Sequence, residues 1–195
     1  MADGERPTFV VIGGPNGAGK STFVSRVGVG ENVDPDAIAK RLDPTDPAAA
    51  AVRAAREAVK LLRSWKVEGR SFTYETTPAS NASLKEIDDA RAKGHEIRLY
   101  FIALDNAAQS AERVDYRVVR GGHDIQASKI VRRFELTFAN AVEAALKVDR
   151  FELIDNHKGD FRSVLLIESG RAVARHASDS PRIEAAIARL LASLG

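Results

Sequence analysis

Short apolar runs alternate along this chain with stretches in which apolar residues recur every three or four positions. Runs of the first kind predict buried strands, and the second kind predicts amphipathic helices. We expect strands at residues 8–12, 31–34, 71–76, 96–104 and 150–155. The run at 96–104 is the longest, so it is expected at the centre of the sheet.

Helices are expected between these strands. They are predicted at 20–27, at 36–42, from Asp46 to Gly69, from a capping box of Ser83 and Glu86 to Gly94, at 106–120 and at 126–147. The helix after Asp46 has an apolar stripe expected to lie on the sheet, formed by Val52, Ala55, Val59 and Leu62. The helix at 126–147 has a second stripe, formed by Ile130, Phe134, Phe138 and Ala141.

Strands that alternate with helices favour a mainly parallel sheet covered on both faces. Residues 164–168 and 171–175, joined by Ser169 and Gly170, predict a hairpin at the edge of this sheet. Pro181 opens a closing helix. A length of 195 residues suits one domain and is short for two, so we expect a single α/β domain over residues 1–195.

Composition excludes several classes of function. The chain has no cysteine, which excludes disulfides and thiolate zinc sites, and its four histidines lack the spacing of a metal cluster. No apolar run reaches the length of a membrane span, and the first residues lack the apolar stretch of a signal peptide. The net charge of +2 is too small to indicate nucleic acid. We therefore expect a cytoplasmic protein with no membrane partner.

A glycine-rich stretch between the first strand and the first helix carries the most specific chemical signal. It matches G-x-x-x-x-G-K-[ST] and predicts a nucleoside triphosphate site at Gly14, Pro15, Asn16, Gly17, Ala18, Gly19, Lys20, Ser21 and Thr22. Its amides and the following helix start would hold phosphate oxygens. Lys20 would meet the β- and γ-phosphates, and the Ser21 hydroxyl would bind Mg²⁺. We therefore expect the three-layer fold of P-loop NTPases and kinases.

Two carboxylates follow the second strand, close in topology to the phosphate loop. A hydroxyl that accepts a phosphoryl group needs a carboxylate to orient it and take its proton, and Asp36 is the candidate. Two alternatives stay open. Asp36 could be only a carboxylate favoured by the helix dipole, and Asp34 is a rival for the same role.

Polar residues also end the third strand. Glu75 could hold Mg²⁺ through water or fix an acceptor hydroxyl, and Thr77 lies beside it. Strand-end polar residues are also often only solvated. No run of four apolar residues ends in Asp, so a conventional second carboxylate for the metal is not evident.

Arginines gather around the glycines at 121 and 122. Arg113, Arg117 and Arg120 share one helix face, and Arg132 and Arg133 follow on the next helix. Such a cluster suits a lid that closes over a triphosphate, with the two glycines as its hinge. The alternative is a solvated basic face. The guanine-reading pattern N-K-x-D is absent after Asp155, which disfavours a GTPase.

Six segments together resemble the zeta toxin family of P-loop kinases. They are GGPNGAGKST, VDPDAIAKRL, YETT, GHEIRLYFIAL, RVDYRVVRGGHDIQASKIVRRF and ELIDN, in the family's order, and the resemblance covers roughly residues 9–156. The phosphate loop is shared by many families, whereas the long arginine-rich segment together with DPD and ETT is far more specific.

The resemblance implies an ATP- and Mg²⁺-dependent kinase that acts on a small molecule. Its implied catalytic residues are Asp36 as the base, Lys20, Arg120 and Arg133. It places Glu75, Thr77 and Arg132 at the acceptor, and Arg117 and Asn156 at the nucleotide, with Asn156 near the adenine. The best-known members phosphorylate the 3′-hydroxyl of UDP-N-acetylglucosamine and are held inactive by a small antitoxin protein. The short chain looks more like compact chromosomal relatives.

Two other functions remain open from the sequence. A polynucleotide or nucleoside kinase would use the same loop, although few exposed aromatics are expected for base stacking, which disfavours nucleic acid. A non-catalytic ATP-binding module is the second, because the conventional second metal carboxylate is missing.

Overall fold

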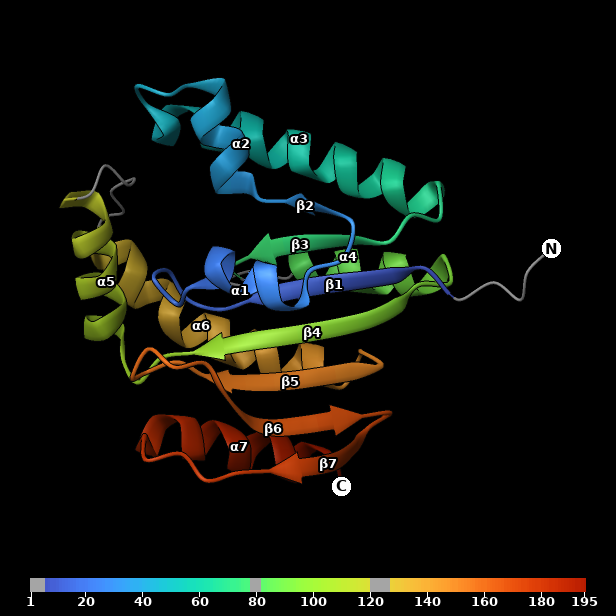
Figure 1. Ribbon diagram of the computed structural model, residues 1–195, viewed down its shortest axis with the longest axis vertical. Coiled ribbons are helices and arrows are strands. Elements are labelled where there is room, and N and C mark those ends of the chain that lie inside the picture. The colour runs from blue at the N-terminus through green and yellow to red at the C-terminus, as the bar shows by residue number, and fades with distance from the viewer. Residues whose placement is uncertain (1–5, 78–81, 120–126) are drawn as a thin grey trace.

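The computed structural model describes residues 6–77, 82–119 and 127–195 (Figure 1). Its sheet has the strand order β2-β3-β1-β4-β5-β6-β7. The strands are β1 (Thr8–Gly13), β2 (Glu31–Val33), β3 (Phe72–Thr76), β4 (Glu96–Ala103), β5 (Arg150–Asp155), β6 (Arg162–Glu168) and β7 (Arg171–Arg175). The helices are α1 (Lys20–Val27), α2 (Pro35–Leu42), α3 (Pro47–Val67), α4 (Ala82–Ala92), α5 (Ala107–Val119), α6 (Ala127–Ala145) and α7 (Pro181–Ser193).

The first five strands in this order, β2, β3, β1, β4 and β5, are parallel, and β6 and β7 continue the sheet in antiparallel pairing. In Figure 1, α1 lies in front of the sheet and α4, α6 and α7 lie behind it, which gives three layers. The predicted α/β fold with a central β4 and an edge hairpin is confirmed. The described helices include none long and apolar enough to cross a bilayer.

The carboxyl ends of the parallel strands meet at one edge of the sheet. The pairing sets Gly13 of β1 beside Thr76 of β3, and Ala103 of β4 beside Asp155 of β5. Parallel sheets of this kind bind ligands at that edge. The phosphate loop, Glu75 and the segment after β5 are therefore brought together although they are far apart in sequence.

The hairpin of β6 and β7 forms one edge of the sheet. Ser169 and Gly170 both have positive φ angles, 49° and 75°, which suits the tight turn between the strands. The register shifts at Leu166–Ile167, and β7 begins and ends with arginine. The predicted hairpin is confirmed.

The prediction for the buried face of α3 is wrong except at Leu62. Val52 and Val59 are 64 % and 50 % exposed, and Ala55 is also exposed. The buried row instead begins with three alanines and continues through larger side chains: Ala50, Ala54, Ala58, Leu62 and Lys66. A row of alanines lets a helix backbone approach its neighbours closely, and this packing outweighs burial of the larger valines.

The predicted capping box of α4 is also wrong. Ser83 lies inside the helix, after Ala82, and Glu86 accepts a hydrogen bond from Lys66 of α3 at 2.5 Å. Lys66 is buried, and a buried ammonium requires a carboxylate partner. The ion pair with Lys66 therefore takes the place of a capping role for Glu86. The stripe on α6 is confirmed, because Ile130, Phe134, Phe138 and Ala141 are all buried.

Candidate active site

A cavity of about 1230 Å³ lies at the carboxyl edge of the parallel strands. Its wall combines the phosphate loop, the start of α2, the end of β3, one face of α3, and α5 with α6. The charged residues in the wall are Lys20, Asp34, Asp36, Glu75, Arg113, Arg117, Lys129, Arg132 and Arg133. Three other alanines of α3, outside its buried row, also line the cavity: Ala48, Ala51 and Ala55. The phosphate loop, the carboxylates and the arginines, which the sequence predicts to act together, therefore line the same cavity.

The phosphate loop has the backbone shape needed to hold an anion. Gly17 and Gly19 adopt φ angles of 72° and 90°, which L side chains rarely adopt. A Cβ on Gly19 would lie 2.9 Å from the ring of Phe161, so a side chain there would clash. The N-cap of α1 is Gly19, which has no side chain to cap the helix. The first N–H groups of this helix are thus available to a bound anion.

Lys20 lies beneath this loop and is held by oxygen atoms of the backbone. Its ammonium donates to the carbonyls of Gly14 and Pro15, each at 3.1 Å, and to the Thr77 hydroxyl at 3.3 Å. Burial lowers the pKa of Lys20. The negative charges of Asp36 and Glu75 partly offset this effect, and the positive charge of Arg117 lowers the pKa further. A phosphate bound beside Lys20 would favour its charged form.

Ser21 and Glu75 form an oxygen-rich corner of the cavity. The Ser21 hydroxyl donates to Glu75 Oε2 at 2.7 Å, and the Asn32 amide donates to Oε1 at 2.6 Å. Burial raises the pKa of Glu75, which these two hydrogen bonds lower in part. A hydroxyl and a carboxylate are oxygen ligands of the kind that Mg²⁺ prefers, so Ser21 and Glu75 fit this ion.

Asp34 and Asp36 both line the cavity but differ in their contacts. Asp34 is the N-cap of α2, and its Oδ1 accepts from the backbone N–H of Asp36 at 2.9 Å. Burial raises the pKa of Asp34, and the Asp36 charge raises it further. Asp36 is exposed in the first turn. The local geometry thus gives the capping role to Asp34 and leaves the Asp36 carboxylate at the cavity wall.

Cations from two helices line the opposite wall. Arg117 of α5 and both Arg132 and Arg133 of α6 lie there, as does Lys129, which sequence reasoning missed. Lys129 precedes Arg132 and Arg133 by three and four positions, so the helical spacing already placed it on their face. Arg120 and the hinge at Gly121–Gly122 lie outside the described residues.

Arg113 and Asn156 meet behind the cavity wall. The Arg113 guanidinium donates to the carbonyls of Asn156 and His157, at 2.7 and 3.0 Å. Asn156 does not line the cavity, and only 3 % of it is exposed. Its amide donates to the carbonyl of Ala18 in the phosphate loop at 2.9 Å. The position near adenine expected for Asn156 stays a prediction.

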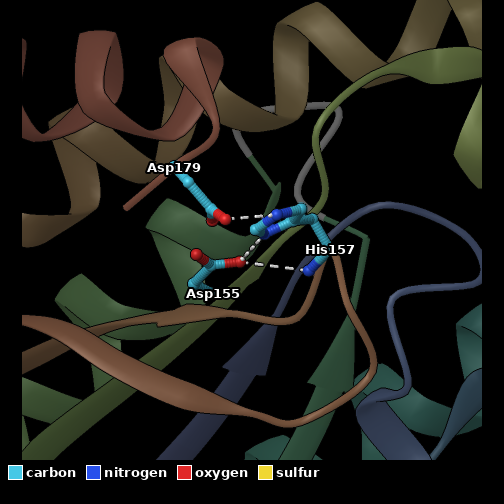
Figure 2. Close-up of side chains that lie close together, drawn as sticks. All are labelled: Asp155, His157 and Asp179. Atoms are coloured by element: carbon cyan, nitrogen blue, oxygen red, sulfur yellow. Dashed lines mark hydrogen bonds and ion pairs between the residues drawn. The ribbon is translucent and has the colours of Figure 1, made fainter. Parts of the chain in front are cut away.

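Asp155, His157 and Asp179 lie close enough together to be considered as a metal site (Figure 2). However, each ring nitrogen of His157 faces a different carboxylate, Asp155 at 2.6 Å and Asp179 at 3.1 Å. Arg162 donates to Asp155 at 3.0 Å, and Lys158 pairs with Asp179. Because the carboxylates already meet cations, this cluster is better described as an ion-pair network than as a metal site.

Asp155 is fully buried in this network. Burial alone would raise its pKa, but hydrogen bonds from Ser178 and His157 outweigh that effect and hold the pKa below the ordinary value of an aspartate. The Ser178 hydroxyl lies at 2.6 Å and the backbone N–H of His157 at 3.0 Å. The network thereby fixes the segment after β5 to the segment that precedes α7.

Comparison with known proteins gives consistent relationships. The profile of the zeta toxin family matches residues 1–161. An uncharacterized protein of Haemophilus influenzae is 29 % identical over 123 residues, which cover 62 % of this chain and 88 % of that protein.

Two solved structures share the fold. One comes from work on the PezAT chromosomal toxin–antitoxin system of Streptococcus pneumoniae, with a TM-score of 0.63 and 16 % identity over 96 % of this chain and 86 % of that one. The other is the AvrRxo1-ORF1:-ORF2 complex with ATP, with a TM-score of 0.66 and 16 % identity over 94 % of this chain. The chain spans 64 % of the matched AvrRxo1 complex chain. At these identities the structural likeness concerns the fold.

Proposed function

The chain belongs to the zeta toxin family of P-loop kinases, and on this premise we propose that it transfers the γ-phosphate of ATP to a hydroxyl group of a small acceptor. One observation carries the proposal. A single cavity is lined both by the phosphate loop with Lys20 and by the Asp36 carboxylate, so a triphosphate and an acceptor hydroxyl can occupy the same space.

In this proposal the phosphate loop binds and orients the donor. Its amides and Lys20 hold the β- and γ-phosphates, and Ser21 and Glu75 hold Mg²⁺. When bound, Mg²⁺ neutralises charge on the phosphate oxygens. The ATP-bound AvrRxo1 complex, which shares the fold, supports ATP as the nucleotide.

Asp36 acts on the acceptor. Its carboxylate takes the proton from the acceptor hydroxyl while the hydroxyl oxygen forms a bond to the γ-phosphorus and the bond from that phosphorus to the β,γ-bridging oxygen breaks. The products are the phosphorylated acceptor and ADP. Arg133, with Arg132, Arg117 and Lys129 on the same wall, stabilises the negative charge of the transferring group.

We propose a nucleotide-sugar such as UDP-N-acetylglucosamine as the acceptor class. Family membership supports this choice, and a cavity above the usual upper size of about 1000 Å³ for a single small ligand leaves room for two. The short side chains of Ala48, Ala51 and Ala55 keep the α3 wall open. Thr77, directly after β3, lines this cavity and accepts a hydrogen bond from Lys20.

A small antitoxin protein is the proposed macromolecular partner. The PezAT system is described as a toxin–antitoxin system, and AvrRxo1-ORF1 is found in complex with ORF2. We also propose that residues 1–195 form one domain, since the sheet runs without interruption from β2 to β7.

The test is to incubate the protein with Mg²⁺ and ATP labelled at the γ-phosphate, together with UDP-N-acetylglucosamine or a metabolite extract. Mass spectrometry should find one hydroxyl-bearing metabolite that gains a single phosphate. Label on oligonucleotide ends would favour a polynucleotide kinase instead. ATP that binds but is never consumed, with any acceptor, would favour a non-catalytic module.

A further inference from the structure

Asn156 joins four parts of the molecule although it does not touch the cavity. Its backbone N–H donates to Ala103 at the end of β4 at 3.0 Å, and its side-chain amide donates to the Ala18 carbonyl at 2.9 Å. Its side-chain oxygen accepts from the N–H of Phe161 at 3.3 Å, and its carbonyl accepts from Arg113 at 2.7 Å. A buried residue with this many bonds fixes its neighbours relative to each other.

The bond to Ala18 acts on the phosphate loop through the geometry of one peptide group. In a planar trans peptide, the C=O and the N–H point in opposite directions. Because the Ala18 carbonyl is turned toward Asn156, the N–H of the same group, which belongs to Gly19, is turned away from Asn156. Gly19 lines the cavity and directly precedes Lys20. Asn156 thus sets the direction of an amide at the point where α1 begins.

Phe161 lies beside Asn156 and next to the same peptide group. It adopts a φ of 43°, a strained value for a residue with a large side chain. Its ring lies against Gly19 and packs on Phe23 with ring centroids 5.2 Å apart. The bond from its N–H to Asn156 helps hold that conformation.

We propose that Asn156 is a positioning residue for the phosphate loop, which orients the Gly19 amide toward a bound triphosphate and links it to Arg113. The inference rests on the proposed function only in requiring that the loop binds a triphosphate. It assigns Asn156 to the phosphates, acting through the backbone, and gives it no contact with the base.

Inorganic tripolyphosphate separates these two roles, because it carries the phosphates of ATP without a base or sugar. The experiment measures Mg²⁺-dependent binding of ATP and of tripolyphosphate to the wild-type protein and to Asn156→Asp by calorimetry. The new carboxylate would face the Ala18 carbonyl, oxygen against oxygen. Both affinities should fall by the same factor, on the order of tenfold to a hundredfold.

Two further variants complete the test. Phe161→Leu keeps an apolar side chain but removes the ring from Gly19, and it should weaken both ligands equally, by about threefold to tenfold. Ser178→Ala is the matched control, because Ser178 is also buried, bonds to the neighbouring Asp155 and makes no described contact with the loop. This control should lower the melting temperature and leave both affinities unchanged.

The outcomes are distinct. Loss of ATP affinity with unchanged tripolyphosphate affinity would assign Asn156 to the base and overturn the inference. Unchanged affinities for both ligands, in Asn156→Asp or in Phe161→Leu if the first variant does not fold, would reduce Asn156 to a structural role and also overturn it. A wild-type protein that binds neither ligand would instead overturn the proposed function itself.

Discussion

The molecule contains two clusters of charge at the same edge of its sheet, and they differ in how the charges are compensated. In the cavity, cations outnumber carboxylates, and Lys20 and Arg113 donate to backbone carbonyls. Around His157, the carboxylates of Asp155 and Asp179 are bonded to cationic or imidazole groups. Among the described residues, the cavity has more positive charges than carboxylates, whereas the positive and negative charges around His157 are close to balanced.

This difference distinguishes a binding site from a structural element. Excess positive charge in a concave site is costly unless an anion binds there, so it indicates a ligand. A balanced network holds two segments together and gains nothing from a further ion. Histidine and carboxylates near each other are therefore a weaker indication of function than an excess of positive charge among the described residues that line a cavity. Four predictions test this comparison.

The largest effect is expected for Asp36→Asn. Removing the proposed base should lower kcat by about 10²- to 10⁴-fold while the affinity for ATP is kept. Asp34→Asn is the matched control, two residues away in the same helix start, and it should change kcat far less because an asparagine still caps α2. Steady-state kinetics on both variants with one acceptor decide between them. Equal losses in the two variants would contradict the separate roles.

Lys20→Ala is expected to have the next largest effect. It removes the charge that is proposed to hold the triphosphate, so ATP affinity and turnover should fall together, with kcat/KM lower by about 10²- to 10³-fold. Calorimetry and kinetics on the same preparation measure the two quantities. Unchanged kinetics in this variant would remove the cavity from consideration as the nucleotide site.

The pH dependence of kcat/KM should be narrower than ordinary pKa values allow. Glu75 has a raised pKa, so it takes up a proton at a higher pH than an ordinary glutamate, and activity should begin to fall early as the pH decreases. Lys20 has a lowered pKa, so it loses its charge early as the pH increases. Glu75→Gln removes this contribution, so the acidic limb should begin at a lower pH, with a reduced maximum, while deprotonation of the proposed base Asp36 is still required. An acidic limb that begins at the same pH in Glu75→Gln as in the wild type would assign it to another group.

The smallest effect is expected in the network around His157. Asp179→Ala removes an exposed partner of His157 and Lys158, which should cost about 1 kcal/mol or less and lower the melting temperature by no more than about 4 °C. The kinetic constants should stay within twofold of wild type. Adding Zn²⁺ to the wild-type protein should not raise the melting temperature. A clear increase that disappears in Asp179→Ala would show that this cluster binds metal after all.

Much of the fold could be predicted because it depends on local pattern. Runs such as 96–104 have the length and composition of a buried strand, and the phosphate loop fixes what precedes and follows it. The pattern failed on α3, where Val52 and Val59 suggested the wrong face, since a row of alanines has a weak hydrophobic signal but packs closely. It failed for Glu86, whose partner Lys66 lies on a different helix.

The candidate site could be predicted only in part, for a related reason. The phosphate loop, Asp36 and the arginines could each be predicted from residues that lie close together in the sequence. Asn32 beside Glu75, Asn156 beside Ala18, and Asp179 beside His157 are contacts between distant segments, set by the order of the strands. Since no local pattern encodes strand order, these roles required the three-dimensional arrangement.

The edge strand β7 has a consequence for how the molecule interacts with other protein molecules. An open sheet edge offers unpaired backbone groups to strands of other molecules, which is a common start of aggregation. Here β7 has an arginine at each end, and its pairing with β6 is interrupted by the register shift at Leu166–Ile167. Two copies that met along this edge would bring like charges together on an irregular strand. The sheet can therefore end in solvent without recruiting a neighbour.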